Sequence, residues 1–220
     1  MADVDEAAPG RRYHHGDLPN ALRQAALELI EEVGPTGFSL REVARRAGVS
    51  HAAPAHHFGD KNGLVTALAI DGFELLATAM GDVIDEHDDP IERLVAQGQA
   101  YVRLARTNRS HFAVMWLPDV HHEDEDERLA DLGMRTFGCL VETIEQIRER
   151  YRPDLDVELA ALKCWALVQG LSELTEPMEG KIEYPSEEGT TAVPAGDELV
   201  EQVLRLSISG MVPGHEGPGS

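Results

Sequence analysis

The stretch FSLREVARRAGVSHAAPAHHFGDKNGL, from Phe38 to Leu64, carries the pattern that decides the fold of this chain. Ser39 and Glu42 form an S-x-x-E capping box, which predicts that a helix begins there. Gly48 permits the left-handed backbone of a sharp turn, and Ser50 is a suitable N-cap for a second short helix. Two short helices joined by a glycine turn predict a helix-turn-helix, whose second helix fits the major groove of DNA.

Apolar residues recur at helical spacing on both sides of this stretch, so helices are expected along the chain. The expected helices cover residues 17–33, a long segment after residue 60, and 91–107, 110–117, 128–151, 156–175 and 197–208. No segment alternates with the period of a strand, and the Pro-, Gly- and Glu-rich segment 176–196 is predicted to be a loop. The sequence thus predicts an all-α fold of about nine helices.

These helices divide into an N-terminal three-helix helix-turn-helix domain and a C-terminal helical bundle. The DNA-binding domain is predicted over residues 11–75, after a flexible leader at 1–10. The bundle, expected to sense a ligand and to dimerise, is predicted over 85–210, before a flexible tail at 211–220. The boundary is expected within the long fourth helix or just after it.

Charge is distributed unevenly along the chain. The formal net charge is −21, which by itself argues against binding to phosphates. Residues 11–63 hold seven basic and six acidic side chains, a charge of +1 that leaves −22 for the rest. Only this N-terminal part is therefore expected to approach nucleic acid.

The residue pattern argues against an enzyme, a metal protein and a membrane protein. Cys139 and Cys164 lack C-x-x-C or metal-like spacing, which fits a reducing cytoplasm. There is no apolar run of about 18 residues and no signal peptide, so no membrane is expected. The His- and carboxylate-rich run 121–127 is expected to be solvated rather than to bind metal, and no cofactor or catalytic motif is recognised.

Four motifs resemble the DNA-binding domain of TetR-family regulators over about residues 11–75: YHHGDL at residues 13–18, SLREVARRAGVS, AAPxxHF and DKxGL. The resemblance implies that the third helix is the recognition helix and that Lys61 contacts phosphate. It also implies a ligand-released repressor that acts as a homodimer on a palindromic operator. Members commonly carry Tyr at the position of Ala55, so a phosphate contact and some stacking area are missing here.

The side chains expected to contact double-stranded DNA lie in and around this motif. Those expected at or close to base edges are Ser50, His51, Ala52, Ala53 and His56. Those expected at phosphates are Arg41, Arg45, Arg46 and Lys61. For His57, packing in the helix-turn-helix core beside Phe58 is the alternative to DNA contact.

Two downstream motifs, HFAVMW (residues 111–116) and CWALVQGLSEL (residues 164–174), more weakly resemble the C-terminal domain of a TetR subgroup with a Trp-His-Gly signature. Gln169 stands where His is usual, and an orienting hydrogen bond is expected from it. The densest set of large, soft side chains predicts an apolar pocket for a small molecule, with ordinary core packing as the alternative. The expected ligand-binding residues are Phe112, Met115, Trp116, Met134, Phe137, Trp165 and Gln169.

A homodimer is expected to form through the last two long helices. The apolar residues expected on its surface are Leu159, Leu162, Leu167, Val168, Val200, Val203, Leu204 and Ile208. Two other functions are weighed against the regulator. One is a protein-binding adaptor that has lost DNA, which the acidic net charge and Ala55 suggest. The other is an enzyme in the C-terminal pocket, for which no acid–base pair or nucleophile is recognised.

Overall fold

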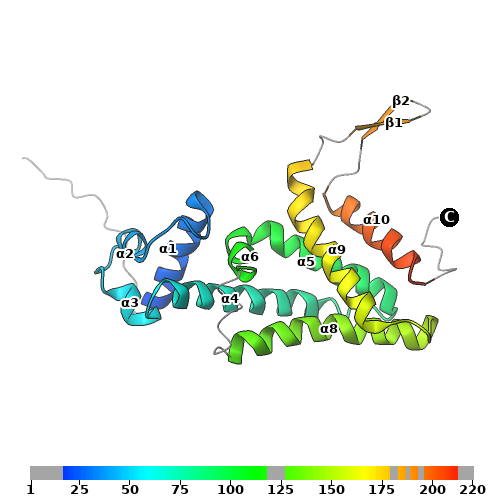
Figure 1. Ribbon diagram of the computed structural model, residues 1–220, viewed down its shortest axis with the longest axis horizontal. Helices are drawn as coiled ribbons and strands as arrows, with labels where there is room; N and C mark the ends of the chain where they lie inside the picture. The colour runs from blue at the N-terminus through cyan, green and yellow to red at the C-terminus, as the bar shows by residue number, and fades with distance from the viewer. Residues whose placement is uncertain (1–16, 118–126, 179–182, 187–188, 193–195, 213–220) are drawn as a thin grey trace, which may run out of the picture. The chain divides into compact units, whose positions relative to one another are not determined.

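A computed structural model of the protein describes residues 17–117, 127–178, 183–186, 189–192 and 196–212. These residues form nine helices and one hairpin (Figure 1). The helices are α1 (Leu18–Val33), α2 (Leu40–Ala47), α3 (Ala53–Phe58), α4 (Lys61–Asp82), α5 (Pro90–Thr107), α6 (Arg109–Met115), α8 (Glu127–Tyr151), α9 (Val157–Met178) and α10 (Gly196–Ser209). The predicted all-α fold is confirmed.

A short hairpin corrects the prediction that residues 176–196 form a loop. Strand β1 (Glu183–Ser186) pairs antiparallel with β2 (Gly189–Ala192), and Ser186 lies opposite Gly189. Tyr and Thr residues, which favour strands, stand in these two segments. The segments are too short to show a strand period, so the pattern could not be read from the sequence.

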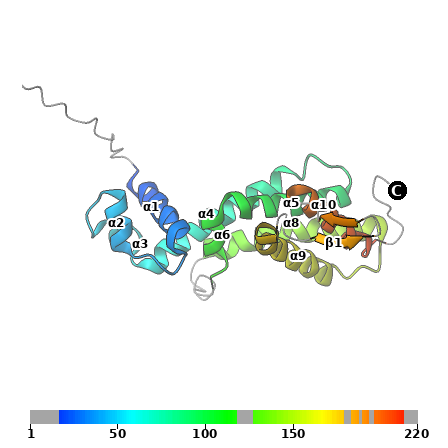
Figure 2. The ribbon, with the colours of Figure 1, turned by 90° about the horizontal axis from the view of Figure 1, so that it is seen from above.

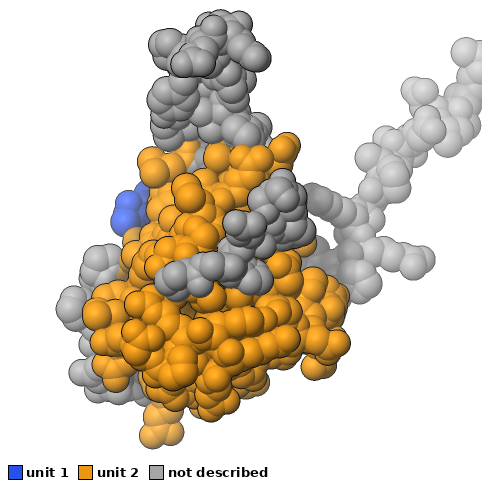
Figure 3. Space-filling view, turned by 90° about the vertical axis from the view of Figure 1, so that its right-hand side faces the viewer, with its two compact units in different colours: residues 1–64 blue, residues 65–220 orange. Residues whose placement is uncertain are grey.

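The chain divides into two compact units, residues 1–64 and 65–220, which are coloured separately in Figure 3. The division falls inside α4, before the expected end of the DNA-binding domain at residue 75. The physical reason is that α4 beyond residue 64 packs into the second unit. Leu68, Phe73 and Leu76 are buried there, and the backbone of Gly72 closely approaches the side chain of Met115.

Unit 1 contains the helix-turn-helix, with α1, α2 and α3 in mutual contact (Figure 2). The capping box is present, since the Ser39 amide donates to Glu42 Oε2 at 2.9 Å and the Glu42 amide donates to Ser39 Oγ at 3.4 Å. Gly48 has the expected left-handed conformation, with φ 69° and ψ 32°. Ser50, however, is not the N-cap of α3.

The N-cap of α3 is Ala52, whose side chain accepts no hydrogen bond. The turn after Gly48 is longer than expected, and within it the Ser50 carbonyl accepts from the Ala53 amide at 3.0 Å. Pro54 occupies the first turn of α3 and has no N–H to satisfy, so this helix needs less capping than an ordinary one.

In unit 2, α5 is the central helix and contacts α6, α8, α9 and α10 (Figures 1 and 2). It is buried along most of its length, and Asp89 caps its start by accepting from the Ile91 amide at 2.8 Å. Met211 and Val212, expected in a flexible tail, are buried, and Arg152 donates to the Met211 carbonyl at 2.7 Å.

By length and composition, α4 is the one helix in the described part of the chain that is apolar enough to cross a membrane. Half of its most apolar window is buried inside the protein. A core helix of a folded domain has the same features, so this helix does not overturn the expectation that no membrane is involved.

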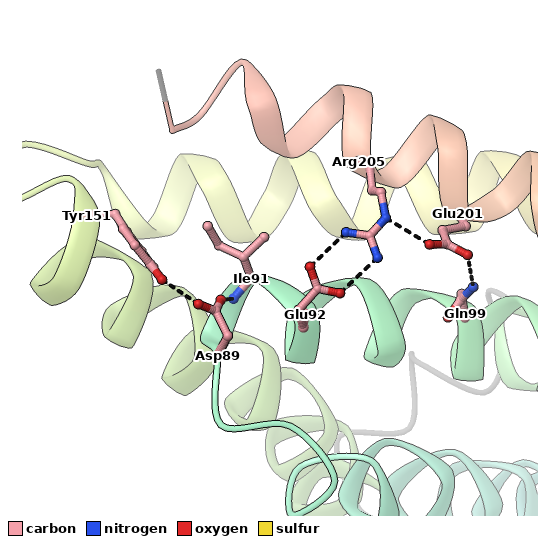
Figure 4. A network of polar contacts seen from close by, with 7 residues as sticks. All are labelled: Asp89, Ile91, Glu92, Gln99, Tyr151, Glu201 and Arg205. Carbon is pink, nitrogen blue, oxygen red and sulfur yellow. Dashed lines mark hydrogen bonds and ion pairs between the residues drawn. The ribbon is translucent and has the colours of Figure 1, made fainter. Parts of the chain in front are cut away.

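A network of polar contacts connects α5 to α8 and α10 (Figure 4). Arg205 donates to both carboxylate oxygens of Glu92 at 2.8 Å and to Glu201 Oε1 at 2.8 Å. Tyr151 of α8 donates to Asp89 at the start of α5. The hydrogen bonds from Arg205 hold the pKa of Glu92 below its ordinary value of 4.5.

Replacement of Glu92 by Gln is expected to lower the free energy of unfolding at pH 7 by about 1 kcal/mol, because the bidentate ion pair is partly exposed. Since the folded-state pKa is depressed, the contribution is full above pH 4.5 and is lost as the pH falls through the folded value. Urea unfolding from pH 7 to pH 3 should therefore show a weaker pH dependence in the variant. Glu145→Gln, at an exposed position of α8, is the control, and an unchanged pH dependence in Glu92→Gln would contradict this account.

Candidate functional site

The residues expected to read DNA lie largely on an exposed face of α3 and of the turn before it. Those exposed are Ser50, His51, Ala52 and His56, and Ala53 is half-buried. His57 is also exposed, so the alternative that it packs in the core is wrong. Pro54 and Phe58, four residues apart on one helix face, point inward instead, and the Arg23 guanidinium lies 5.6 Å from the Phe58 ring centroid.

Two of the four expected phosphate-binding side chains have structural partners within unit 1. Arg46 donates to both carboxylate oxygens of Glu32 at 2.7 Å. Lys61 donates to the Thr36 carbonyl at 2.8 Å, with its Nζ 4.4 Å from the Phe38 ring centroid. These contacts tie α2 to α1, and the first turn of α4 to the loop before α2. Arg41 and Arg45 are exposed, and of the four they are the ones most accessible to a phosphate.

Unit 2 contains a mostly apolar cavity of about 510 Å³, within the usual size range of small-molecule sites. Four aromatic rings from different parts of the bundle line it in series. Phe73 and Trp116 have ring centroids 5.5 Å apart, Trp116 and Trp165 are 5.6 Å apart, and Trp165 and Phe137 are 5.6 Å apart. Such tilted and edge-to-face pairs are favourable aromatic geometries, so they form a continuous wall.

Four of the seven residues expected to bind a ligand border this cavity, namely Trp116, Met134, Phe137 and Trp165. Met134 is 71% exposed, which places it where the cavity meets solvent. The other three do not border it, because packing occupies their side chains. Phe112 lies edge-to-face on Tyr101 at 5.7 Å, Met115 is fully buried against Gly72, and Gln169 accepts a hydrogen bond from the Tyr101 hydroxyl at 2.6 Å.

Sequence reasoning missed the polar residues that do border the cavity. Gln97 is 1% exposed and donates through Nε2 to the Cys139 carbonyl at 3.4 Å. Its Oε1 is buried and has no hydrogen-bond partner among the described residues. The sequence does hold a signal for Gln97, which stands at a position where the helical spacing from Leu94 to Tyr101 would place a buried apolar residue.

Two further groups that line the cavity are held neutral by burial. Burial raises the pKa of the Tyr101 hydroxyl well above its ordinary value of 10.0 and that of the Cys164 thiol to about 11. Both therefore stay protonated at neutral pH, and Cys164 is not an activated nucleophile. The expected pocket is thus mostly apolar with a few neutral polar groups.

Comparisons with known proteins agree with this geometry. The family model described as "Bacterial regulatory proteins, tetR family" matches residues 22–68, and "Tetracyclin repressor-like, C-terminal domain" matches residues 94–177. The HTH-type transcriptional repressor KstR2 of Mycobacterium tuberculosis is 30% identical over 149 residues, which cover 63% of this chain and 71% of KstR2. This chain belongs to the TetR family.

Two further relatives match this chain over almost its whole length. The HTH-type transcriptional repressor Rv3405c of Mycobacterium tuberculosis is 29% identical over 199 residues, which cover 89% of this chain and 87% of Rv3405c. A solved structure of a protein with unknown function from Rhodococcus sp. RHA1 is 29% identical, with a TM-score of 0.73 and coverage of 92% and 99%. The narrower resemblance to the Trp-His-Gly subgroup stays a prediction.

The family assignment places this protein among transcriptional regulators rather than enzymes, as the sequence predicted. Within the described ranges, no group of three or more His, Cys, Asp or Glu side chains is arranged to hold a metal ion. The charge run that was considered for metal binding lies outside the described residues, except for Glu127.

Proposed function

We propose that this TetR-family regulator is a repressor that binds a two-fold symmetric operator as a homodimer and is released by a small molecule bound in unit 2. The observation that carries the proposal is that one chain combines an exposed helix-turn-helix face with an apolar cavity in a separate unit. The relatives named as repressors support the direction of regulation. A cytoplasmic location belongs to the same proposal, because bacterial operator DNA lies in the cytoplasm.

Selection of DNA from a random pool, followed by fluorescence anisotropy at several salt concentrations, tests the proposal. The selected sequence is expected to be an inverted repeat whose half-sites lie about one helical turn apart. Its binding constant is expected to fall steeply as the salt concentration rises. A folded protein that enriches no DNA would overturn the operator-binding part. Association with protein partners and a flat salt dependence would then favour the adaptor.

His51→Ala is expected to weaken binding to the selected operator about tenfold and to leave random DNA almost unchanged. The reason is that His51 is exposed just before α3, where base edges are read in this type of domain. Arg45→Ala is the matched comparison, because an exposed phosphate contact should weaken both DNAs alike and reduce the salt slope by about one. An equal loss on both DNAs for His51→Ala would refute its base-reading role.

The dimer surface is proposed on α9 and α10, with a corrected set of residues. Val168, Val200, Leu204 and Ile208 are buried within the protomer, because their helix faces form its own core. Leu159 at 65% and Leu162 at 57%, both in the expected set, are exposed, and so are Leu174 at 57% and Leu206 at 75%. Lys163 donates to the Ser207 carbonyl at 2.8 Å. This hydrogen bond joins α9 to α10 next to Leu162 and Leu206 in the sequence, which supports placing these two leucines in one surface.

The ligand is proposed to act through its different affinities for the DNA-binding state and the released state. It lowers operator affinity by the ratio of those affinities and by no more. Helix α4 begins in unit 1 and continues in unit 2, so it is the covalent route by which a change at the cavity reaches the DNA-binding unit. A tightly bound ligand that leaves operator affinity unchanged would contradict this mechanism for that ligand.

A further inference from the structure

The cavity of unit 2 has an uncharged lining among the described residues. None of the described residues that line it is Asp, Glu, Lys, Arg or His. An ion that enters an apolar site without a counter-charge loses its hydration without compensation, which costs far more than the transfer of a neutral group. A carboxylate, a phosphate ester or an organic ammonium is therefore disfavoured against an uncharged molecule of the same size.

Gln97 also places a buried polar group at the cavity. Its Nε2 donates to the Cys139 carbonyl, and this assigns the orientation of the amide, because a reversed amide would set Oε1 against that carbonyl oxygen. The remaining Oε1 is buried with no partner among the described residues, although Gln97 borders the cavity. A buried acceptor without a donor is unfavourable, so a molecule that supplies one gains affinity.

Two other polar side chains at the cavity, Thr136 and Tyr101, differ from Gln97 because their hydroxyl hydrogens are already used. Thr136 Oγ1 donates to the Leu132 carbonyl at 2.8 Å, and the Tyr101 hydroxyl donates to Gln169 Oε1. The aromatic wall from Phe73 to Phe137 supplies flat apolar surface for the rest of the ligand. The buried, unpartnered acceptor of Gln97 can therefore orient a ligand at this cavity.

We propose that the cavity binds an uncharged, largely apolar molecule that donates one hydrogen bond, from a hydroxyl or an N–H group, to Oε1 of Gln97. The inference rests on the proposed function in taking this cavity as the effector site, and it adds the chemical class of the effector. It disfavours ligands whose charged group must enter the cavity, because none of the described lining residues supplies a counter-charge.

Isothermal titration of the full-length protein with four matched probes tests this. The probes are 4-pentylphenol, its methyl ether, 4-pentylbenzoate and 4-pentyl-N,N,N-trimethylanilinium, which share an apolar body and differ in the polar group. The phenol is expected to bind about tenfold more tightly than the ether, and both more tightly than either ion. The chain has two tryptophans, Trp116 and Trp165, and both border the cavity, so their fluorescence reports whether the probe enters it.

Gln97→Met removes the acceptor and keeps a side chain of similar shape. It is expected to abolish the preference for the phenol over the ether and to raise the melting temperature of the free protein, since a buried unpartnered acceptor is gone. A merely structural Gln97 would lower that temperature instead. Thr136→Val, at the same cavity, is the matched control and should keep the preference.

Equal binding of phenol and ether, tighter binding of either ion, no binding of any probe, or an unchanged preference in Gln97→Met would each overturn the inference. The titrations contain no DNA, so their failure is distinct from a failure of operator selection. If the protein distinguishes the probes but selects no operator, the proposed function is wrong. If it selects an operator but does not distinguish the probes, only the proposed chemical class of the effector is wrong.

Discussion

Replacement of Gly63 by Ala is expected to abolish operator binding, because it places a methyl group against the backbone of Phe58. An ideal Cβ on Gly63 lies 2.0 Å from the Phe58 carbonyl oxygen. That carbonyl accepts from the Asp60 amide at 3.0 Å in the tight turn at Gly59, where φ is 75°. Backbone in such a turn cannot move aside as the end of a flexible side chain does.

The expected loss of stability in unit 1 is about 3 kcal/mol or more, at the upper end for overpacking. A small domain has little stability in reserve, so operator affinity is expected to fall more than about 100-fold. Anisotropy with the selected operator and urea unfolding followed by circular dichroism measure the two effects.

Gly81→Ala in the same helix is the matched control. No atom lies within 4 Å of an ideal Cβ on Gly81, and Ala is the better helix former by about 0.5–1 kcal/mol. This variant should be as stable as the parent protein or slightly more stable, and should bind the operator normally. Normal operator binding by Gly63→Ala would show that the close approach at the turn between α3 and α4 does not exist in solution.

The second large effect is expected from Leu162→Glu, which should convert the proposed dimer to monomers. Two-fold symmetry brings one substituted residue from each protomer into the proposed interface, so two carboxylates would lose hydration in an apolar contact. A monomer reads one half-site, and the loss of the linked second half-site should lower operator affinity by at least about 100-fold. Sedimentation at micromolar concentration and anisotropy with the operator are the measurements.

Two observations separate this effect from misfolding. Leu162 is 57% exposed in the protomer, so the charge is tolerated in the monomer and thermal unfolding of unit 2 should change little. Leu162→Met keeps an apolar side chain and should remain a dimer that binds the operator. A Leu162→Glu protein that still sediments as a dimer would place the interface on another surface.

Local signals in the sequence predicted most of the helices correctly. Ser39 with Glu42 marked the start of α2, and the long helix expected after residue 60 begins as α4 at Lys61, where Asp60 Oδ1 accepts from the Gly63 amide at 2.9 Å. These signals work because a capping side chain and its backbone partner stand within three residues of each other. The expectation failed at Ser50, where the longer turn after Gly48 and Pro54 in the first turn shifted the start of α3.

The types of residue in the sequence predicted only some of the side chains that border the cavity. Large aromatic and soft side chains predicted a pocket, and Trp116, Met134, Phe137 and Trp165 do border one. Composition could not separate these from Phe112, which packs beside the cavity without bordering it, because all such residues are equally apolar in the sequence. The unpartnered acceptor of Gln97 became visible only once the neighbours of α5 were known.

Helix periodicity, caps and glycine turns depend on residues a few positions apart, so the all-α class, the helix-turn-helix and the TetR-family resemblance could be predicted from the order of residues alone. The partner that each side chain meets depends on the packing of the folded chain. This packing paired Arg46 with Glu32, assigned Gln169 to Tyr101, buried Leu204 within the protomer and left Leu206 on the surface. Those outcomes depend on how helices distant in sequence rotate and pack against one another, and the same residue types satisfy either arrangement.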